Sequence, residues 1–320
     1  MTQRIIIAYN PRSSKHLRIR QEVIEPLQKK SGYAIGKFEV KSVPVNENAK
    51  ALSKILVDDD LLIVVGGDGT ATVGINAAML TKAKITLGVL GYGNFNDFAR
   101  MLQSKNLEQI LKDFEGKRTK ILYPLEARLD GKLWRYAACY FTIGMFAEST
   151  EVFDAPKTRK SLKGGKKSLC YSVFQLAKWY FQNRKKEFLA RDIRMDGVSM
   201  NRMKISRNGR MKEVKGAHVS DVLFVNGKTV ARIMKDGNYW QDEQIFSVSF
   251  GRLKGFFRLC NFMLKSMIFK MPGHVVKGET KIEFDAPAEF EIQAEGEYAK
   301  VKAKELVVRK TTRGVKVVVS

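Results

Sequence analysis

The sequence predicts two domains, an N-terminal α/β domain with a parallel sheet and a C-terminal antiparallel β-sandwich. Strand and helix patterns alternate over about the first 115 residues, whereas short β-rich runs separated by turn residues prevail beyond residue 120. A chain of 320 residues is long enough for two domains of ordinary size, each with its own core. We therefore expect domains at residues 1–122 and 123–307.

The N-terminal elements follow from hydrophobic periodicity. Apolar or alternating runs predict four strands: RIIIAY (4–9), KFEVKSV (37–43), LLIVV (61–65) and ITLGVL (85–90). Helical spacing and capping residues predict four helices: 16–30, 46–56, 70–80 and 95–102. Strands that alternate with helices imply a parallel sheet covered on both faces, and ligands bind such sheets beyond the carboxyl ends of the strands.

The C-terminal elements are mostly short strands. Two β-rich runs within residues 122–144 flank Asp130-Gly131, a dipeptide that suits a tight hairpin turn. Further short strand patterns continue to about residue 310, as expected for a sandwich. Two helical stretches interrupt them, at 168–184 and 254–270. The last residues, about 308–320, are a candidate to return to the first domain.

Charge is the unusual feature of the composition. The chain has 57 Lys and Arg residues against 33 Asp and Glu, a formal net charge of +24. Such an excess indicates an anionic partner: nucleic acid, an anionic membrane or a phosphorylated ligand. Zinc-binding spacing, a recognition-helix pattern and aromatic RNA-binding strands are all missing from the sequence, which argues against nucleic acid.

Cysteine usage and hydropathy bear on the compartment. Cys139, Cys170 and Cys260 lie far apart in apolar runs without a CxxC pair, which favours buried thiols in a reducing compartment. The start MTQRIIIAY does not fit a signal peptide, and no stretch reaches the roughly 18 uncharged apolar residues of a membrane-spanning helix. We expect a cytoplasmic protein that is soluble or peripherally membrane-associated.

The motif GGDGT (66–70) follows the apolar strand at 61–65 and precedes a predicted helix. Glycines let the backbone approach a phosphate group, and the helix start offers free N–H groups and the positive end of its dipole. The Lys-Ser/Thr of a Walker loop is missing, and GYGNFN (91–96) lacks the last glycine of a Rossmann fingerprint. Asp68 would be repelled by phosphates unless a cation such as Mg²⁺ stood between them. A plain tight turn is the alternative.

These residues together resemble the diacylglycerol kinase catalytic family, which includes sphingosine and other lipid kinases. The ordered motifs that carry the resemblance are IAYNPRSSK (7–15), VVGGDGT (64–70), LGVLGYGNFNDFARML (87–102), FVNGKTVARIM (224–234) and IQAEGEY (292–298), the last similar to the family's DGE motif. The resemblance implies an α/β nucleotide domain, a C-terminal β-sandwich for the lipid substrate, and ATP-dependent phosphorylation of a lipid hydroxyl.

The resemblance also implies roles for the residues of the glycine loop. Asn10 and Thr70 would contact the nucleotide. The glycines of the loop would cradle its phosphates: Gly66, Gly67 and Gly69. Asp68 would be catalytic and would organise Mg²⁺ or its waters.

Further roles follow for the second loop and the other domain. Asn96 and Asp97 would support the phosphate and ribose end of the nucleotide, and Asn94 takes the place of a family threonine that faces ATP phosphate. An ordinary helix N-cap is the alternative for Asn96 and Asp97. Glu297 would face the acceptor hydroxyl as the general base.

The sequence departs from the family pattern at several positions. The substituted residues are Ser14 for Gly, Val73 for Glu, Gly91 for Pro, Asn94 for Thr and Glu295 for Asp. The loop at 235–243, KDGNYWQDE, matches the family's acidic turn poorly, which argues against a structural metal there. These departures predict a nucleotide site that is functional but remodelled.

Two stretches are candidates for a membrane surface. Residues 157–167, KTRKSLKGGKK, hold six basic residues and no acidic one, among them Lys163, Lys166 and Lys167, and an apolar aromatic stretch follows. Residues 252–270 mix Phe, Met and Leu with five basic residues. Basic clusters beside aromatic helices suit anionic lipid. The alternative is that these helices pack on the sandwich and their charges are solvated; the loop at 157–167 is the better membrane candidate.

We therefore expect a cytoplasmic, peripherally membrane-associated lipid kinase that uses ATP and Mg²⁺, with diacylglycerol as the leading acceptor and phosphatidic acid as product. One alternative is an NAD kinase-like or other GGDG kinase with a soluble substrate. Another is a degenerate kinase homologue that binds lipid without turnover. A homodimer is possible, and the sequence specifies neither the acceptor lipid nor the oligomeric state.

Overall fold

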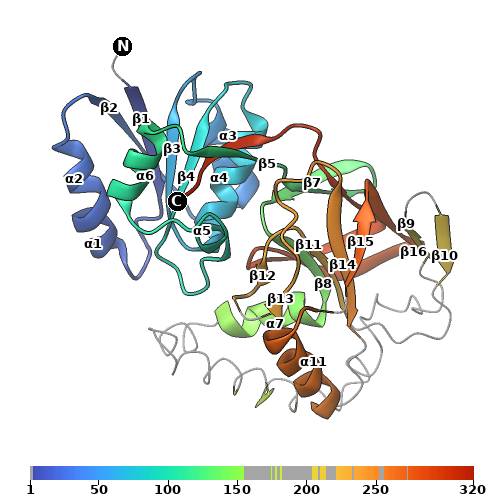
Figure 1. Cartoon of the computed structure of the whole chain (residues 1–320). Coiled ribbons are helices and arrows are strands. Elements are labelled where there is room, and N and C mark those ends of the chain that lie inside the picture. The colour runs from blue at the N-terminus through green and yellow to red at the C-terminus, as the bar shows by residue number, and fades with distance from the viewer. Residues whose placement is uncertain are drawn as a thin grey trace.

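The structure is a computed structural model in which two domains lie side by side (Figure 1). It describes residues 3–154, 174, 177–178, 181, 204–207, 210–213, 221–232, 234–251, 256–271 and 273–320. The basic loop at 157–167 and most of the stretch at 168–184 lie outside the described residues, so the predictions made for them stay predictions. In the described part of the chain, no helix is long and apolar enough to cross a membrane.

The first domain is built on a six-stranded sheet of order β2-β1-β3-β4-β18-β5. Its strands are β1 (Gln3–Tyr9), β2 (Tyr33–Glu39), β3 (Leu61–Gly66), β4 (Thr86–Gly91), β5 (Thr119–Leu122) and β18 (Val315–Val318). All neighbours are parallel except β5, which pairs antiparallel with β18. The predicted parallel sheet is therefore confirmed, and the last strand of the chain lies between β4 and β5.

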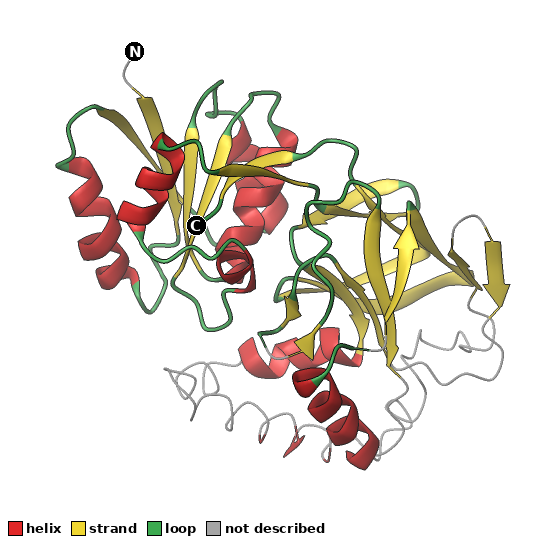
Figure 2. Cartoon of the chain, viewed as in Figure 1, coloured by secondary structure: helices red, strands yellow, loops and turns green. Residues whose placement is uncertain are grey.

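Helices cover both faces of this sheet (Figure 2). They are α1 (His16–Ile19), the π-helical turn η1 (Arg20–Ile24), α2 (Glu25–Gln28), α3 (Val45–Ser53), α4 (Asp68–Leu80), α5 (Asp97–Met101) and α6 (Leu107–Glu115). Side chains alternate along β1, so that Ile6 packs with α3 and α4 while Ile5 packs with α1, α2 and α6. Burial of both faces explains the continuous apolar strands.

One strand begins and ends earlier in the sequence than predicted. The prediction placed it at 37–43, but β2 ends at Glu39. The buried side chain of Asn48 accepts a hydrogen bond from Lys41 N (2.9 Å) and donates to the carbonyls of Lys41 and Val43 (3.1 Å each). Because this amide satisfies the backbone of 41–43, the segment leaves the sheet.

The second domain is antiparallel, as predicted. Its strands are β6 (Leu125–Leu129), β7 (Lys132–Ala137), β8 (Tyr140–Gly144), β9 (Lys204–Arg207), β10 (Arg210–Glu213), β11 (Asp221–Val225), β12 (Thr229–Val230), β13 (Met234–Lys235), β14 (Ile245–Gly251), β15 (Gly273–Lys277), β16 (Glu279–Ala294) and β17 (Glu297–Lys310). In the part of this domain that the structure describes, α7 (Met145–Asp154) and α11 (Phe256–Ile268) are helices. The main sheet has the order β15-β14-β11-β8-β16-β17-β6-β7, with β9 paired to β16 and β10 to β9, while β12 and β13 form a separate two-stranded sheet.

A long hairpin, β16–β17, organises this sheet. Its register shifts between Glu283 and Ala288, and such an irregularity bends a strand. Phe224 of β11 and Val276 of β15, at one side of the sheet, share a core with Leu125 of β6 at the other. The strands therefore form one hydrogen-bonded network that bends around a common core, instead of two separate sheets.

The two domains share an apolar core at their junction. Cys139, Leu223 and Met271 of the second domain belong to the same buried cluster as α3 and α4. Cys139 is buried as predicted, whereas Cys260 is exposed on α11, so the prediction of a buried thiol is wrong for Cys260. Its position on the outward face of an amphipathic helix accounts for this exposure.

A buried lysine lies where the chain passes from one domain to the other, once near Tyr123 and once near Thr311. Lys310 Nζ donates to the carbonyl oxygens of Tyr123 (3.0 Å) and Tyr239 (2.9 Å) and to the side-chain oxygen of Asn226. Burial lowers the pKa of Lys310 to about 7, since the charged form is poorly solvated there. The adjoining Thr311 N donates to Pro124 O (3.0 Å), so both crossings lie together.

Candidate active site

The carboxyl ends of three neighbouring strands define the candidate site. Because β1, β3 and β4 are parallel and adjacent, Asn10, Gly67 and Gly93 follow their strands at one edge of the sheet. Tyr92 N donates to Gly66 O (2.7 Å), and a Cβ on Gly67 would lie 3.2 Å from the Cα of Gly93. The two glycine loops therefore pack backbone against backbone, which side chains at Gly67 and Gly93 would prevent.

Helix α4 begins directly at the first glycine loop. Gly67 is its N-cap and, as a glycine, has no side chain that could cap the first turn. The first N–H groups of a helix have no intrahelical partners, so this turn can bind an anion such as a phosphate group. Thr70 is buried against Gly66, where a Cβ on the glycine would lie 2.6 Å from the threonine Oγ1.

Asp68 joins the two loops. One of its carboxylate oxygens accepts a hydrogen bond from Asn96 N (3.0 Å) and the other from Asp97 N (2.9 Å). Burial raises the pKa of Asp68 to about 6; these backbone hydrogen bonds oppose the rise, and the charge of Glu297 adds to it. The carboxylate is therefore mostly ionised at pH 7 and holds the second loop in place.

Asn96 closes the second loop. It has a left-handed backbone (φ 56°), and its side chain accepts from Gly93 N (2.6 Å) and donates to Gly93 O (2.9 Å). Its amide group is thus bonded within the loop, so its contribution to phosphate binding would be to shape the backbone. Asn94, at the tip of the same loop, is exposed.

Asp97 faces the second domain. Its Oδ1 accepts from Thr229 Oγ1 (3.0 Å) and from Arg232 N (2.8 Å), while its buried Oδ2 has no hydrogen-bond partner among the described residues. Burial, and next the charge of Asp68, raise the pKa of Asp97 to about 7. Asp97 therefore ties α5 to the β12–β13 turn as well as bordering the loop.

The turn of the β16–β17 hairpin brings two further carboxyl groups to this place. Glu295 and Gly296 have positive φ values of 50° and 90°, as expected for a tight two-residue hairpin turn. Glu295 is only 2% exposed; it accepts from Cys139 N and lies 3.4 Å from Thr72 Oγ1. Burial raises the pKa of Glu295 to about 8, so it is mostly protonated at pH 7.

Glu297 follows the turn and lies against the start of α4. A Cβ on Gly69 would overlap the Glu297 carboxylate, so that side chain reaches the backbone of the first helical turn. The structure thus brings Glu297, from the second domain, next to the GGDGT loop, and its predicted role as general base stays a prediction. Asp68, Asp97, Glu295 and Glu297 form an acidic cluster between the domains.

Two basic residues near the cluster were not among the predicted site residues. Lys15 Nζ donates to Gly93 O (3.3 Å), and burial lowers its pKa. The final lysine of IAYNPRSSK was a usable signal for it. Arg135 of β7 is 8% exposed, and neither its Nε nor its Nη1 has a hydrogen-bond partner among the described residues. Burial lowers the pKa of Arg135 and the charge of Glu297 opposes that change, so the two groups interact electrostatically.

Asn10 shapes the chain after β1. Its side-chain oxygen accepts from Arg12 N (2.9 Å) and its carbonyl from Ser13 N (3.1 Å). These bonds form a compact turn that leads to Lys15. The predicted nucleotide contact of Asn10 stays a prediction.

The donor set limits how a metal ion could be held. The described residues contain no group of three or more His, Cys, Asp or Glu side chains arranged around a metal position. Asp68 could offer a ligand through the second lone pairs of its oxygens, and phosphate oxygens and water would complete the shell. Mg²⁺ is commonly held in this way in phosphoryl-transfer sites, so the residues present fit Mg²⁺ bound with a nucleotide.

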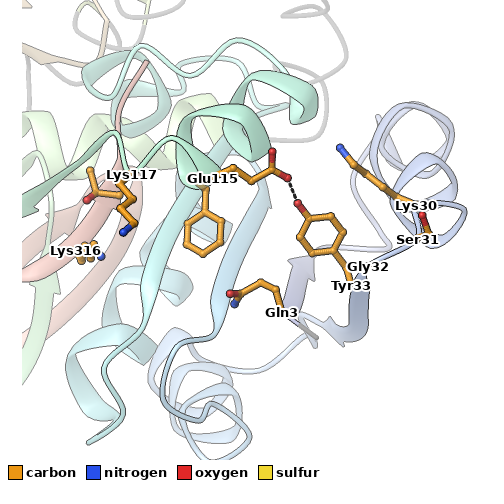
Figure 3. Close-up of a pocket in the computed structure, with 10 residues that line it drawn as sticks. Gln3, Lys30, Ser31, Gly32, Tyr33, Glu115, Lys117 and Lys316 are labelled. Atoms are coloured by element: carbon orange, nitrogen blue, oxygen red, sulfur yellow. Dashed lines mark hydrogen bonds between the residues drawn. The ribbon is translucent and has the colours of Figure 1, made fainter. Parts of the chain in front are cut away.

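An open pocket of about 640 Å³ lies on the first domain, away from the glycine loops. It is lined by Gln3, Lys30, Ser31, Gly32, Tyr33, Phe114, Glu115, Lys117, Thr119 and Lys316 (Figure 3). Gln3, Tyr33 and Thr119 are the first residues of β1, β2 and β5. Because β1 and β2 begin at this pocket and the glycine loops follow the opposite, carboxyl ends of the parallel strands β3 and β4, this pocket is separate from the candidate site.

We expect Gly69→Ala to lower turnover by about tenfold to a hundredfold, because misplacing a catalytic group by about 1 Å can cost this much. Alanine suits a helix, but its Cβ would displace the Glu297 carboxylate. Steady-state kinetics with a thermal-unfolding control measures the effect. If the loss arises through Glu297, Gly69→Ala combined with Glu297→Gln should be no slower than Glu297→Gln alone. Additive losses would contradict this explanation.

We expect Glu295→Gln to flatten the dependence of stability on pH. The pKa of Glu295 is raised to about 8 in the folded state, above its value in the unfolded chain. Its contribution to the free energy of unfolding is therefore fully present below the pKa of the unfolded chain and is lost as the pH rises to about 8. The wild-type free energy of unfolding should therefore fall between pH 5 and pH 8, by up to about 1.4 kcal/mol per pH unit more than that of the variant. Unfolding without nucleotide or Mg²⁺ measures it; parallel curves would contradict the assignment.

Comparisons with known proteins agree with this architecture. Residues 4–122 match the family model of the diacylglycerol kinase catalytic domain. A diacylglycerol kinase of Staphylococcus aureus (strain JH9) is 32% identical over 128 residues, which are 38% of this chain and 39% of that protein. The chain thus matches less than half the length of this relative. The resemblance predicted from the N-terminal motifs is confirmed.

Two solved structures share the whole fold. A crystal structure of a diacylglycerol kinase from Bacillus anthracis str. Sterne has a TM-score of 0.66 at 18% identity and covers 99% of this chain and 97% of its own. A second crystal structure from the same strain has a TM-score of 0.70 at 17% identity, with coverage of 99% and 98%. At such identity the likeness establishes the two-domain fold alone.

Proposed function

We propose that this chain, whose residues 4–122 match the family model of the diacylglycerol kinase catalytic domain, is an ATP-dependent kinase that phosphorylates a lipid hydroxyl, with diacylglycerol as the leading acceptor. The observation that carries the proposal is the contact between Glu297 and Gly69, which places a carboxylate of one domain at the glycine loop of the other. The product would be phosphatidic acid.

Phosphoryl transfer requires mainly positioning and charge stabilisation from a protein. The first turn of α4 and the glycine loop would bind the phosphates through backbone N–H groups, with Lys15 beside the second loop as a further positive charge. Asp68 would hold Mg²⁺, which supplies positive charge to the phosphates when it is bound. The hydrogen bonds from Asn96 and Asp97 orient the Asp68 carboxylate for this role.

Glu297 would accept the proton of the attacking lipid hydroxyl. It is partly exposed, unlike the buried Glu295, so it can meet a substrate in the cleft. Arg135 provides a positive charge near Glu297, and the two groups interact electrostatically. Glu295, bonded to Cys139 N, would instead fix the position of the turn.

The decisive experiment compares acceptors side by side. We expect transfer from ATP to diacylglycerol in mixed micelles, and little transfer to NAD or to a sugar phosphate. Preferred phosphorylation of a soluble acceptor would replace the proposal by the alternative of a GGDG kinase with another substrate. ATP binding without transfer to any lipid would favour a degenerate homologue.

A further inference from the structure

Helix α11 presents an apolar face to solvent. Leu264 and Ile268, one helical turn apart, are each 57% exposed, and Phe269 directly after the helix is 66% exposed. Cys260, one turn before Leu264, is exposed too. The i, i+4 spacing aligns these side chains as one stripe along the helix. A stripe of this kind on an amphipathic helix requires a partner.

The sequence around this stripe is rich in basic residues. Six basic residues and no acidic one occur between Gly251 and Gly278: Arg252, Lys254, Arg258, Lys265, Lys270 and Lys277. The side chains of Lys265, Lys270 and Lys277 are exposed. The surface of α11 therefore combines apolar side chains with positive charge, and its natural complement is apolar and negatively charged.

The helix is connected to the candidate active site through one hairpin. Met271 N donates to Lys235 O of β13 (2.8 Å), and α11 packs on this strand. The neighbouring β12 carries Thr229, whose Oγ1 donates to Asp97 Oδ1. Figure 1 shows α11, β13 and β12 at the same end of the second domain. A partner bound to α11 would therefore lie at the end of the second domain whose β12–β13 hairpin contacts Asp97.

We propose that α11 docks on an anionic phospholipid bilayer, with Leu264, Ile268 and Phe269 entering the interface and Lys265 and Lys270 facing the headgroup phosphates. A second copy of the chain fits less well, since a two-fold interface would bring the same lysines together and like charges repel. This docking rests on the proposed function in one respect: a lipid acceptor would reach the site from the bilayer. It also assigns the membrane contact to the helix at 256–268, which the sequence ranked below the loop at 157–167.

The test measures binding of the full chain to sedimented vesicles, without nucleotide or acceptor. Vesicles of phosphatidylcholine with phosphatidylglycerol should bind the wild type more tightly than vesicles of phosphatidylcholine alone. Leu264→Gln, Ile268→Gln and Phe269→Gln together should weaken binding by roughly tenfold or more, because three apolar side chains lose their burial. Leu17→Gln with Val57→Gln, at residues 62% and 49% exposed on the first domain, is the matched control and should bind as wild type.

A second variant keeps the proposal falsifiable if the first fails to fold. Lys265→Gln and Lys270→Gln should each weaken binding to the anionic vesicles by about fivefold and reduce its dependence on salt. Wild-type affinity for the vesicles in both the apolar and the lysine variants would overturn the proposal. It would also be overturned if the wild type were a dimer and these variants were monomers that bind vesicles as the wild type does. Vesicle binding without lipid phosphorylation would uphold the docking and refute the proposed function.

Discussion

Asp68→Asn is expected to lower turnover by about 10²–10³ while the protein remains folded, since losing an electrostatic contact of this kind has that typical cost. Both carboxylate oxygens of Asp68 accept backbone hydrogen bonds, from Asn96 and Asp97. The asparagine NH₂ group would face one of these N–H donors, so the second loop would lose one bond in addition to the charge at the metal position. Phosphate transfer from labelled ATP at several Mg²⁺ concentrations measures the effect.

The chain offers a matched control for this substitution. Asp130 also accepts two backbone hydrogen bonds, from Lys304 N (2.9 Å) and Glu305 N (2.8 Å), but it lies in the β6–β7 turn away from the site. Asp130→Asn should leave turnover within about twofold of wild type, as expected for an exposed substitution outside the site. Wild-type rates for Asp68→Asn, or rates that do not depend on Mg²⁺, would contradict the role of Asp68.

Glu297→Gln is expected to lower kcat by about 10², the low end of the range for general-base catalysis. Loose phosphoryl-transfer transition states need little activation of the nucleophile, which keeps the loss modest. ATP affinity should stay close to wild type because the carboxylate serves the acceptor. Rapid-quench kinetics together with nucleotide binding separates the two effects.

Glu295→Gln should be the milder of the two substitutions. The pKa of Glu295, raised to about 8, leaves the side chain mostly protonated at pH 7, and a neutral glutamine resembles that state. An essential Glu295 and a dispensable Glu297 would mean that the base assignment is wrong by two residues.

Local sequence patterns were sufficient to predict the parallel sheet of the first domain and the position of the GGDGT loop between a strand and a helix. The alternation of strands and helices predicted the parallel sheet. The structure adds that Gly296 lies near Asp68, since a Cβ on this glycine would lie 3.9 Å from Asp68 Cβ. Parallel strands make such predictions possible because their carboxyl ends meet at one edge.

The remaining features depend on contacts between distant segments. The Oδ1 of Asp97 accepts hydrogen bonds from Thr229 and Arg232, more than 130 residues later in the chain, and no sequence pattern indicated these contacts. The buried amide of Asn48 removed residues 41–43 from a predicted strand. Hydrophobic periodicity indicates which face of a helix or strand is apolar. It does not predict which polar side chain will form hydrogen bonds with the backbone of a distant segment.

Transfer of labelled phosphate from ATP to an organic-extractable product, with a total lipid extract as the acceptor, tests the proposed activity most directly. Wild-type protein should produce one labelled lipid that co-migrates with phosphatidic acid, and Asp68→Asn should produce about 10²–10³ times less, as expected for loss of that electrostatic contact. Label that stays in the aqueous phase with wild-type protein, or equal lipid labelling by Asp68→Asn, would contradict a lipid kinase centred on the GGDGT loop.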